Sequence, residues 1–75
     1  MAVTFEYNSD EEKLEIHGSA SALKELARLI HDLAERGSDH EHLMTPSWGG
    51  AELAEDRQGK SNELVHHVKV FCWPG

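Results

Sequence analysis

The chain has 75 residues, and fourteen Asp and Glu side chains outnumber seven Lys and Arg side chains, so the formal net charge is −7. A chain of this length forms one small domain that buries only about 60% of its unfolded surface, which predicts a thin core. The acidic balance argues against nucleic acid as a direct partner, because phosphates would be repelled. No stretch approaches the roughly 20 apolar residues that cross a membrane, and none has the pattern of a signal peptide. Because the single Cys72 also excludes an intramolecular disulfide, we expect one cytoplasmic domain over residues 1–75.

Two strands are predicted near the start of the chain, over residues 3–8 and 13–18. Apolar and polar residues alternate in both, which is the period of a half-buried strand. The apolar positions are Val3, Phe5 and Tyr7 in the first strand and Leu14 and Ile16 in the second. The polar stretch 8–12 predicts a turn, so the two strands form a hairpin.

The segment from Ser19 to Gly37 is predicted to be an amphipathic helix. Its apolar residues recur at spacings of three and four, which places them on one helix face. These residues are Leu23, Leu26, Ala27, Ile30, Leu33 and Ala34. Ser19 or Ser21 can cap the first turn, and Gly37 suits the left-handed residue that ends a helix. Another layer of the domain must cover this apolar face.

Beyond the helix the pattern weakens until a final strand over residues 64–73. Residues 40–44 predict a third strand, and residues 45–62 form a long loop with a brief strand at 51–53. In the final strand, Leu64, His66, Val68, Val70 and Cys72 face the helix, and Val65, His67, Lys69, Phe71 and Trp73 face away. We therefore predict an α+β fold of two layers, with a mainly antiparallel sheet of about four strands and one helix packed on one face, in the order strand, strand, helix, strand, strand.

The sheet face that the helix leaves open is the first candidate for a binding surface. The first two strands and the third would give it polar side chains, as is usual for an open face. These are Thr4, Glu6, Glu15, His17, His40 and His42. The final strand breaks this rule with Val65, Phe71 and Trp73, next to His67, and grouped exposed aromatics mark contact surfaces. Binding of another protein, pairing with a second copy and coverage by the chain's own loop are the alternatives.

The loop supplies a second candidate at Trp48. Acidic residues follow it at Glu52, Glu55 and Asp56, and a tryptophan ringed by acids is typical of a binding hot spot for a basic partner. The alternative is that Trp48 fixes the loop to the core.

Six histidines raise the question of a metal site. His40 and His42 would point the same way on a strand, and His17 or His67 could add a further ligand. A structural zinc site needs four ligands, so we predict no metal or cofactor. No phosphate-binding loop, nucleophile elbow or metalloprotease helix is present, and we expect no enzymatic activity.

The run LEIHGSASALKELARLIHDLAERGSDHEHLM resembles immunity proteins of bacterial polymorphic toxin systems, in particular the immunity protein 32 family. The likeness lies in the strand ending at Ile16–Gly18, the helix, and His40-x-His42-Leu43, with Trp48–Leu53 and the closing strand similar as well. The resemblance implies a cytoplasmic inhibitor that binds and neutralises a cognate toxin without chemistry of its own. It identifies no contact residues.

Our leading interpretation is therefore a small acidic protein-binding module that neutralises a toxin. From the sequence, its predicted partner-binding residues are Trp48, Glu52, Glu55, Asp56, His42, His67, Phe71 and Trp73. The alternatives are a homodimer or larger homo-oligomer that uses the open sheet face as its interface, and a histidine-based metal-binding protein.

Overall fold

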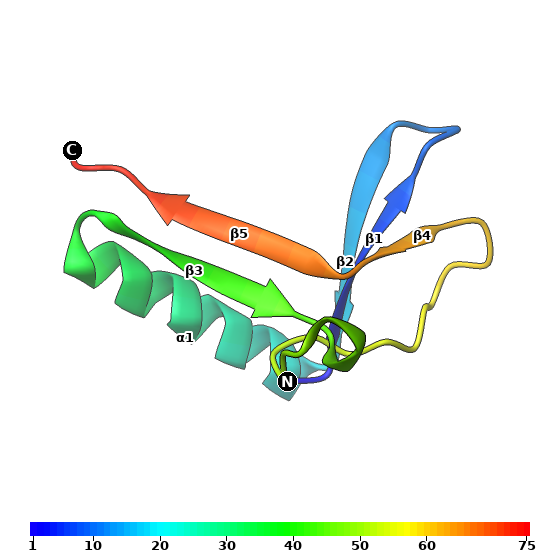
Figure 1. The fold of residues 1–75 in the computed structure, drawn as a ribbon, viewed down its shortest axis with the longest axis horizontal. Helices are drawn as coiled ribbons and strands as arrows, with labels where there is room; N and C mark the ends of the chain where they lie inside the picture. Colours follow the sequence, from blue (N-terminus) through cyan, green and yellow to red (C-terminus); the bar gives the residue numbers. More distant parts are fainter.

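The computed structural model describes residues 1–75, and its elements follow the predicted order as far as the third strand. They are β1 (Val3–Asn8), β2 (Lys13–Gly18), α1 (Ala20–Arg36), β3 (Asp39–Met44), the 3-10 helix η1 (Pro46–Trp48), β4 (Glu63–Val65) and β5 (His67–Cys72). The α+β class, the single helix and the antiparallel pairing are confirmed. In Figure 1, β3 and β5 run side by side along α1, and the hairpin of β1 and β2 stands at an angle to them.

The strands form two sheets rather than the one expected, with the orders β2-β1-β4 and β3-β5. The predicted final strand is interrupted at His66, where the backbone amide of Thr45 donates to the His66 carbonyl at 3.0 Å. The Thr45 hydroxyl and His66 Nδ1 share a second hydrogen bond of 2.6 Å. This bend allows β4 to pair with β1 and β5 to pair with β3.

The bend also changes the face that Val65 occupies. Val65 pairs with Phe5 in the register of β1 and β4, and it packs against the core. The prediction that Val65 lies on the open face is therefore wrong. The brief strand predicted at 51–53 is absent as well, because Leu53 is buried and its amide donates to the Met44 carbonyl at the end of β3 instead of pairing in a sheet.

The ends of α1 follow the capping residues in the sequence. Ser19 Oγ accepts a hydrogen bond from the Ala22 amide at 3.2 Å, which satisfies one of the free amides of the first turn. Gly37 has φ of 85°, a conformation that costs a glycine little, and its amide donates to the Ala34 carbonyl. α1 lacks the length and the continuous apolar character needed to span a bilayer.

The core is as thin as the length implies. Its buried apolar residues are Val3, Phe5, Ala22, Leu26, Leu33, Leu43 and Leu53. All of them except Leu33 form one cluster where α1, the ribbon of β3 and β5, and the start of β1 meet, with Val68 and Val70 of β5 packed against it. The ribbon therefore uses only one of its two faces to cover the helix.

A buried carboxylate holds the long loop against the other face of β1. Glu6 is fully buried, and its Oε1 accepts from the Gly59 amide and from Asn62 Nδ2 at 2.9 and 3.0 Å. Its Oε2 accepts from Thr4 Oγ and the Gln58 amide at 2.5 and 3.0 Å. Burial would raise the pKa of Glu6, but these four donors outweigh it and lower the pKa from 4.5 to about 2. The prediction that Thr4 and Glu6 lie on an open face is wrong, because the loop covers them.

Candidate partner-binding surface

The ribbon of β3 and β5 presents one uncovered face. Its register alternates pairs that face α1, such as Leu43 with Val68, and pairs that face away. The residues that face away are His40, His42 and Met44 of β3 and His67, Lys69 and Phe71 of β5, and we call this surface the open face. As expected from the alternation, Cys72 lies on the helix side, where its Sγ is 3.3 Å from the Gly37 carbonyl oxygen.

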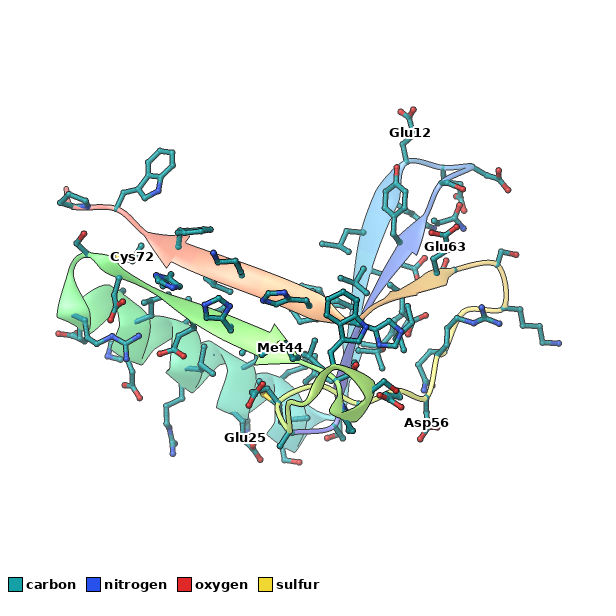
Figure 2. The ribbon with its side chains drawn as sticks, in the orientation of Figure 1. Glu12, Glu25, Met44, Asp56, Glu63 and Cys72 are labelled. Atoms are coloured by element: carbon teal, nitrogen blue, oxygen red, sulfur yellow. The ribbon has the colours of Figure 1, made fainter.

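Ring side chains follow one another along the open face. The ring centroids of Phe71 and His40 are 5.5 Å apart, and those of His40 and His42 are 4.9 Å apart. His42 stacks on His67 with centroids 5.2 Å apart, and their Nδ1 and Nε2 atoms share a hydrogen bond of 2.9 Å. Trp48 continues the row at 6.2 Å from His67. Figure 2 shows ring side chains along the ribbon between the labelled Cys72 and Met44.

The turn after β3 places Trp48 at one end of this row. Its amide donates to the Thr45 carbonyl at 2.9 Å, and the Gly49 amide donates to the Pro46 carbonyl at 3.0 Å. One face of the indole stacks on His66, with centroids 6.0 Å apart and planes 9° apart, yet Trp48 remains 58% exposed. Trp48 therefore contacts the bend at His66 and still exposes more than half of its surface.

Two of the predicted loop acids stabilise this turn from within the chain. Glu52 Oε1 accepts from the Met44 amide at 2.9 Å, and this bond is the main cause of the lowered pKa of Glu52. Glu55 accepts from the Ser47 amide at 2.5 Å, and the Ser47 side chain and amide lower the pKa of Glu55. These carboxylates therefore have intramolecular donors to satisfy them. Asp56 lies apart from the row, in a hollow that His17 also lines.

The predicted residues that gather on the open face are His42, His67 and Phe71, with Trp48 beyond one end. Phe71 is 58% exposed, and Trp73, which follows β5, is 82% exposed. The sequence interpretation did not select Lys69, whose Nζ lies 4.9 Å from the centroid of the Phe71 ring. The alternation in the final strand already placed Lys69 beside them, and His40 was predicted to lie on the open face but was not selected as a partner-binding residue.

The open face contains no acidic residue, although the chain has a net charge of −7. Desolvation lowers the pKa of His42, and the positive charges of Lys69, His40 and His67 lower it further. The His42 imidazole is therefore neutral at neutral pH and can both donate and accept hydrogen bonds. The face combines apolar rings with weak positive charge.

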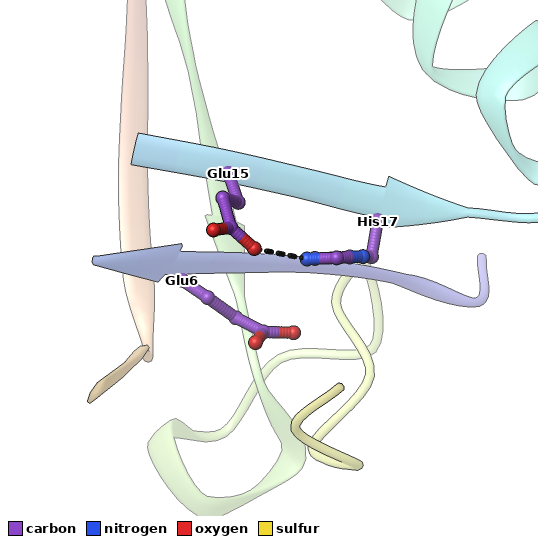
Figure 3. Close-up of side chains that lie close together, drawn as sticks. All are labelled: Glu6, Glu15 and His17. Atoms are coloured by element: carbon purple, nitrogen blue, oxygen red, sulfur yellow. Dashed lines mark hydrogen bonds and ion pairs between the residues drawn. The ribbon is translucent and has the colours of Figure 1, made fainter. Parts of the chain in front are cut away.

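The histidines proposed as metal ligands are divided between the two sheets. His42 and His67 lie together on the ribbon, whereas Nε2 of His17 in β2 donates to Glu15 Oε1 at 2.7 Å. Glu6, Glu15 and His17 have ligand atoms within 4.8 Å of one another, and Figure 3 shows His17 bonded to Glu15 beside Glu6. Asn62 also donates to Glu15. Because protein donors already occupy these carboxylate oxygens, a cation would have to displace them, and we assign the cluster to holding the loop.

Gly50 is the residue on which the shape of this turn depends. A Cβ added there would lie 2.5 Å from the Met44 carbonyl oxygen and 2.6 Å from the Met44 Cβ. We expect Gly50→Ala to shift the turn that carries Trp48 and to lower the free energy of unfolding by about 1–3 kcal/mol, as measured by urea denaturation. The neighbouring Ala51 is exposed, so Ala51→Ser should be close to neutral. Equal stability of the two variants would contradict this view of the turn.

The fold and this surface together define a small α+β domain with an exposed face lined by rings. The family model for immunity protein 32 matches residues 13–69, which include α1, β3, Trp48 and the first half of β5. The chain therefore belongs to the immunity protein 32 family, as the resemblance in its sequence indicated. No curated protein and no solved structure matches the chain significantly.

Proposed function

We propose that this protein is an immunity protein that neutralises a cognate toxin in the cytoplasm by binding it, with the open face of β3 and β5 as the contact surface. Membership of the immunity protein 32 family supports the general role. The observation that carries the choice of surface is the exposure of Trp48, Phe71 and Trp73, each more than half exposed in a chain with few apolar residues to spare. Exposed aromatic groups of this kind mark contact surfaces.

The open face has properties that favour tight binding. Its strands are paired with each other and backed by α1 through Leu43, Val68 and Val70, so little backbone freedom remains to be lost on association. Aromatic rings dominate binding energies at interfaces because they bury a large area with few rotatable bonds. Between the rings of Phe71 and Trp48, the imidazoles can hydrogen-bond to polar groups of the toxin.

The acidic residues would contribute in a different way. Asp56 and the other exposed acids lie off the open face, so they would act through the overall negative charge, which attracts a basic toxin during diffusion and raises the association rate. Glu52 and Glu55 would act mainly by fixing the turn beneath Trp48. Inhibition of this kind needs no catalysis and no cofactor, because occupying the toxin surface is sufficient.

Co-expression with the candidate toxin tests the proposal. A toxin domain encoded beside this protein should arrest growth when it is expressed alone, and co-expression of this protein should restore growth. The purified proteins should form a complex that elutes as one species in size-exclusion chromatography. A variant with Trp48→Ala, Phe71→Ala and Trp73→Ala should fold normally and fail to protect. A complete lack of protection and of binding by the unaltered protein would refute the immunity role, whereas full protection by the triple variant would refute only the surface.

A further inference from the structure

A second uncovered apolar surface lies away from the open face. Several large apolar side chains are between 39% and 56% exposed, which is unusual in a chain with so small a core. They are Tyr7, Leu14, Ile16, Leu23 and Ile30, and we call the surface that they form the apolar corner.

The hairpin supplies one wall of the apolar corner. Its register pairs Phe5 with Ile16 and Tyr7 with Leu14, so these side chains share one face of the sheet. Phe5 on that face is buried in the core beneath α1 and the ribbon. The exposed hairpin residues therefore extend the apolar surface of this sheet face beyond the part that α1 and the ribbon cover.

The helix supplies the floor. Leu23 and Ile30 lie seven residues apart, so they share a stripe along α1 that also contains Ala27 and Ala34. A Cβ at Gly18 would lie 3.3 Å from Leu23 Cδ2, which shows that the stripe begins against the end of β2.

Contacts on the opposite side of α1 fix where this stripe lies relative to the ribbon. Arg36 forms ion pairs with Asp39 and Glu41 of β3 at 3.2 and 2.5 Å. Glu25 and Asp32 line the same hollow as Glu41, so this side of the helix lies below the outer edge of β3. At 100° per residue, Leu23 and Ile30 project from the other side of the helix. They therefore lie toward β5.

The second wall is the free edge of β5. This strand pairs only with β3, so all six residues from His67 to Cys72 have one edge without a neighbouring strand. Figure 1 shows the open angle between β5 and the β1–β2 hairpin. A long unpaired edge beside an apolar surface is a template for another strand.

We propose that a second copy of this chain occupies the apolar corner, with the two β5 strands paired antiparallel about a two-fold axis. The ribbon would become a four-stranded sheet in the order β3-β5-β5-β3, and the Leu23–Ile30 stripes of the two helices would cover each other beneath it. An antiparallel pair of identical strands satisfies two-fold symmetry directly, so one edge serves both copies.

The exposed area of the single chain is large enough for such an interface. The accessible surface is 5137 Å², about 500 Å² more than the roughly 4,600 Å² that size scaling gives for a compact monomer of this mass. The radius of gyration of 12.9 Å also exceeds the roughly 11.3 Å expected for this length. A stable interface covers roughly 800 Å² of each partner, and the excess of about 500 Å² in this chain is of the same order.

The distribution of charge favours a second copy over the toxin as the occupant. β5 has no acidic residue, and the stripe of Leu23, Ala27, Ile30 and Ala34 is uncharged. Two chains with a net charge of −7 can therefore meet here without bringing acids into contact, whereas a basic partner would find no opposite charge on the stripe. This inference does not depend on the immunity role.

Sedimentation velocity over a wide range of micromolar concentrations tests the proposal. The unaltered protein should reach the mass of a dimer, and the double variant Leu23→Glu with Ile30→Glu should weaken dimerisation by roughly tenfold or more, because both carboxylates would be desolvated in the interface. His40→Glu on the open face is the matched control, because His40 is exposed and belongs to the outer strand β3, and it should leave the dimer intact. A monomer at every concentration, a dimer that the double variant does not weaken, or a dimer broken only by His40→Glu would each overturn the proposal.

Two further measurements keep the result clear if the double variant unfolds or if the toxin binds elsewhere. Hydrogen exchange of the unaltered protein should show β5 amides on the free edge becoming protected as the concentration rises, and unchanged exchange would contradict the pairing. The folded monomeric variant should still bind the toxin, because the toxin is assigned to the open face. Loss of toxin binding in this variant, with no dimer in the unaltered protein, would place the toxin in the apolar corner and refute the dimer.

Discussion

Replacing Glu6 by glutamine is expected to lower the free energy of unfolding by about 3 kcal/mol, since a buried charged acceptor loses several of its hydrogen bonds. Each oxygen of the Glu6 carboxylate accepts from two donors, one of which is a backbone amide that cannot turn away. A glutamine has only one oxygen, so in either orientation its NH₂ group faces two donors. A domain of this size has roughly 4–11 kcal/mol of stability in total. We therefore expect a fall of more than about 10 °C in Tm, measured by circular dichroism.

The same measurement at several pH values separates the contribution of the Glu6 charge to stability from that of the side-chain shape. Because the pKa of Glu6 is lowered from 4.5 to about 2 on folding, its contribution to stability is complete above about pH 4.5 and is lost as the pH falls toward 2. The unaltered protein should lose stability over this range more steeply than Glu6→Gln. Glu15, Glu52 and Glu55 also have lowered pKa values. The stability of Glu6→Gln should therefore still fall with decreasing pH, but less steeply. Glu25→Gln on exposed helix surface is the control, and equal stability of both variants would contradict the anchoring role of Glu6.

Truncating the aromatic residues at the two ends of the row is expected to weaken toxin binding more than any other change on the surface. Phe71→Ala and Trp48→Ala should each cost about 2 kcal/mol or more, which is roughly a 30-fold increase in Kd. The reason is that each ring offers more than half of its surface and stands on a rigid element. Isothermal titration calorimetry with the purified toxin domain would measure the effect.

Leu14→Ala provides the matched control for these variants. Leu14 is 56% exposed, close to the 58% of Phe71 and Trp48, but it lies in the apolar corner rather than on the open face. We expect its Kd for the toxin to change by less than about twofold, as for residues outside an interface. If Leu14→Ala weakens binding and the two aromatic variants do not, the proposed contact surface is wrong.

Much of the fold follows from local patterns in the sequence. The helix is specified by the spacing of its apolar residues and by caps at Ser19 and Gly37, all within one continuous segment. The β1–β2 hairpin is specified by alternation around a polar turn. The same alternation placed His42, His67 and Phe71 together, because side-chain direction in a strand depends only on position along the strand.

Features that depend on contacts between distant segments were predicted less well. The final strand has the same period on both sides of His66, so the pattern contains no sign of the bend. The bend depends on Thr45, which lies 21 residues earlier and bonds to both the ring and the carbonyl of His66. The error for Val65 has the same cause, since reversing the face of β4 requires this interruption.

The candidate site shows the same division. The aromatic residues of the open face could be found from the sequence, whereas the roles of the acids could not. Glu52 and Glu55 looked like free loop charges, and only the folded turn brings them to the amides of Met44 and Ser47. In the fold these two carboxylates satisfy backbone donors of the turn that carries Trp48.

The sequence by itself determined the α+β class, the single amphipathic helix with both caps, and the placement of exposed ring side chains on one face of the final strand. Each of these features depends on neighbours within a few residues. The tertiary structure alone decided the division into two sheets, the burial of Glu6 beneath residues 58–62, and the apolar corner beside β5. The physical reason is that hydrogen-bond donors from distant segments must reach Glu6 and His66 before these residues acquire their roles, and no local period records which segments will meet.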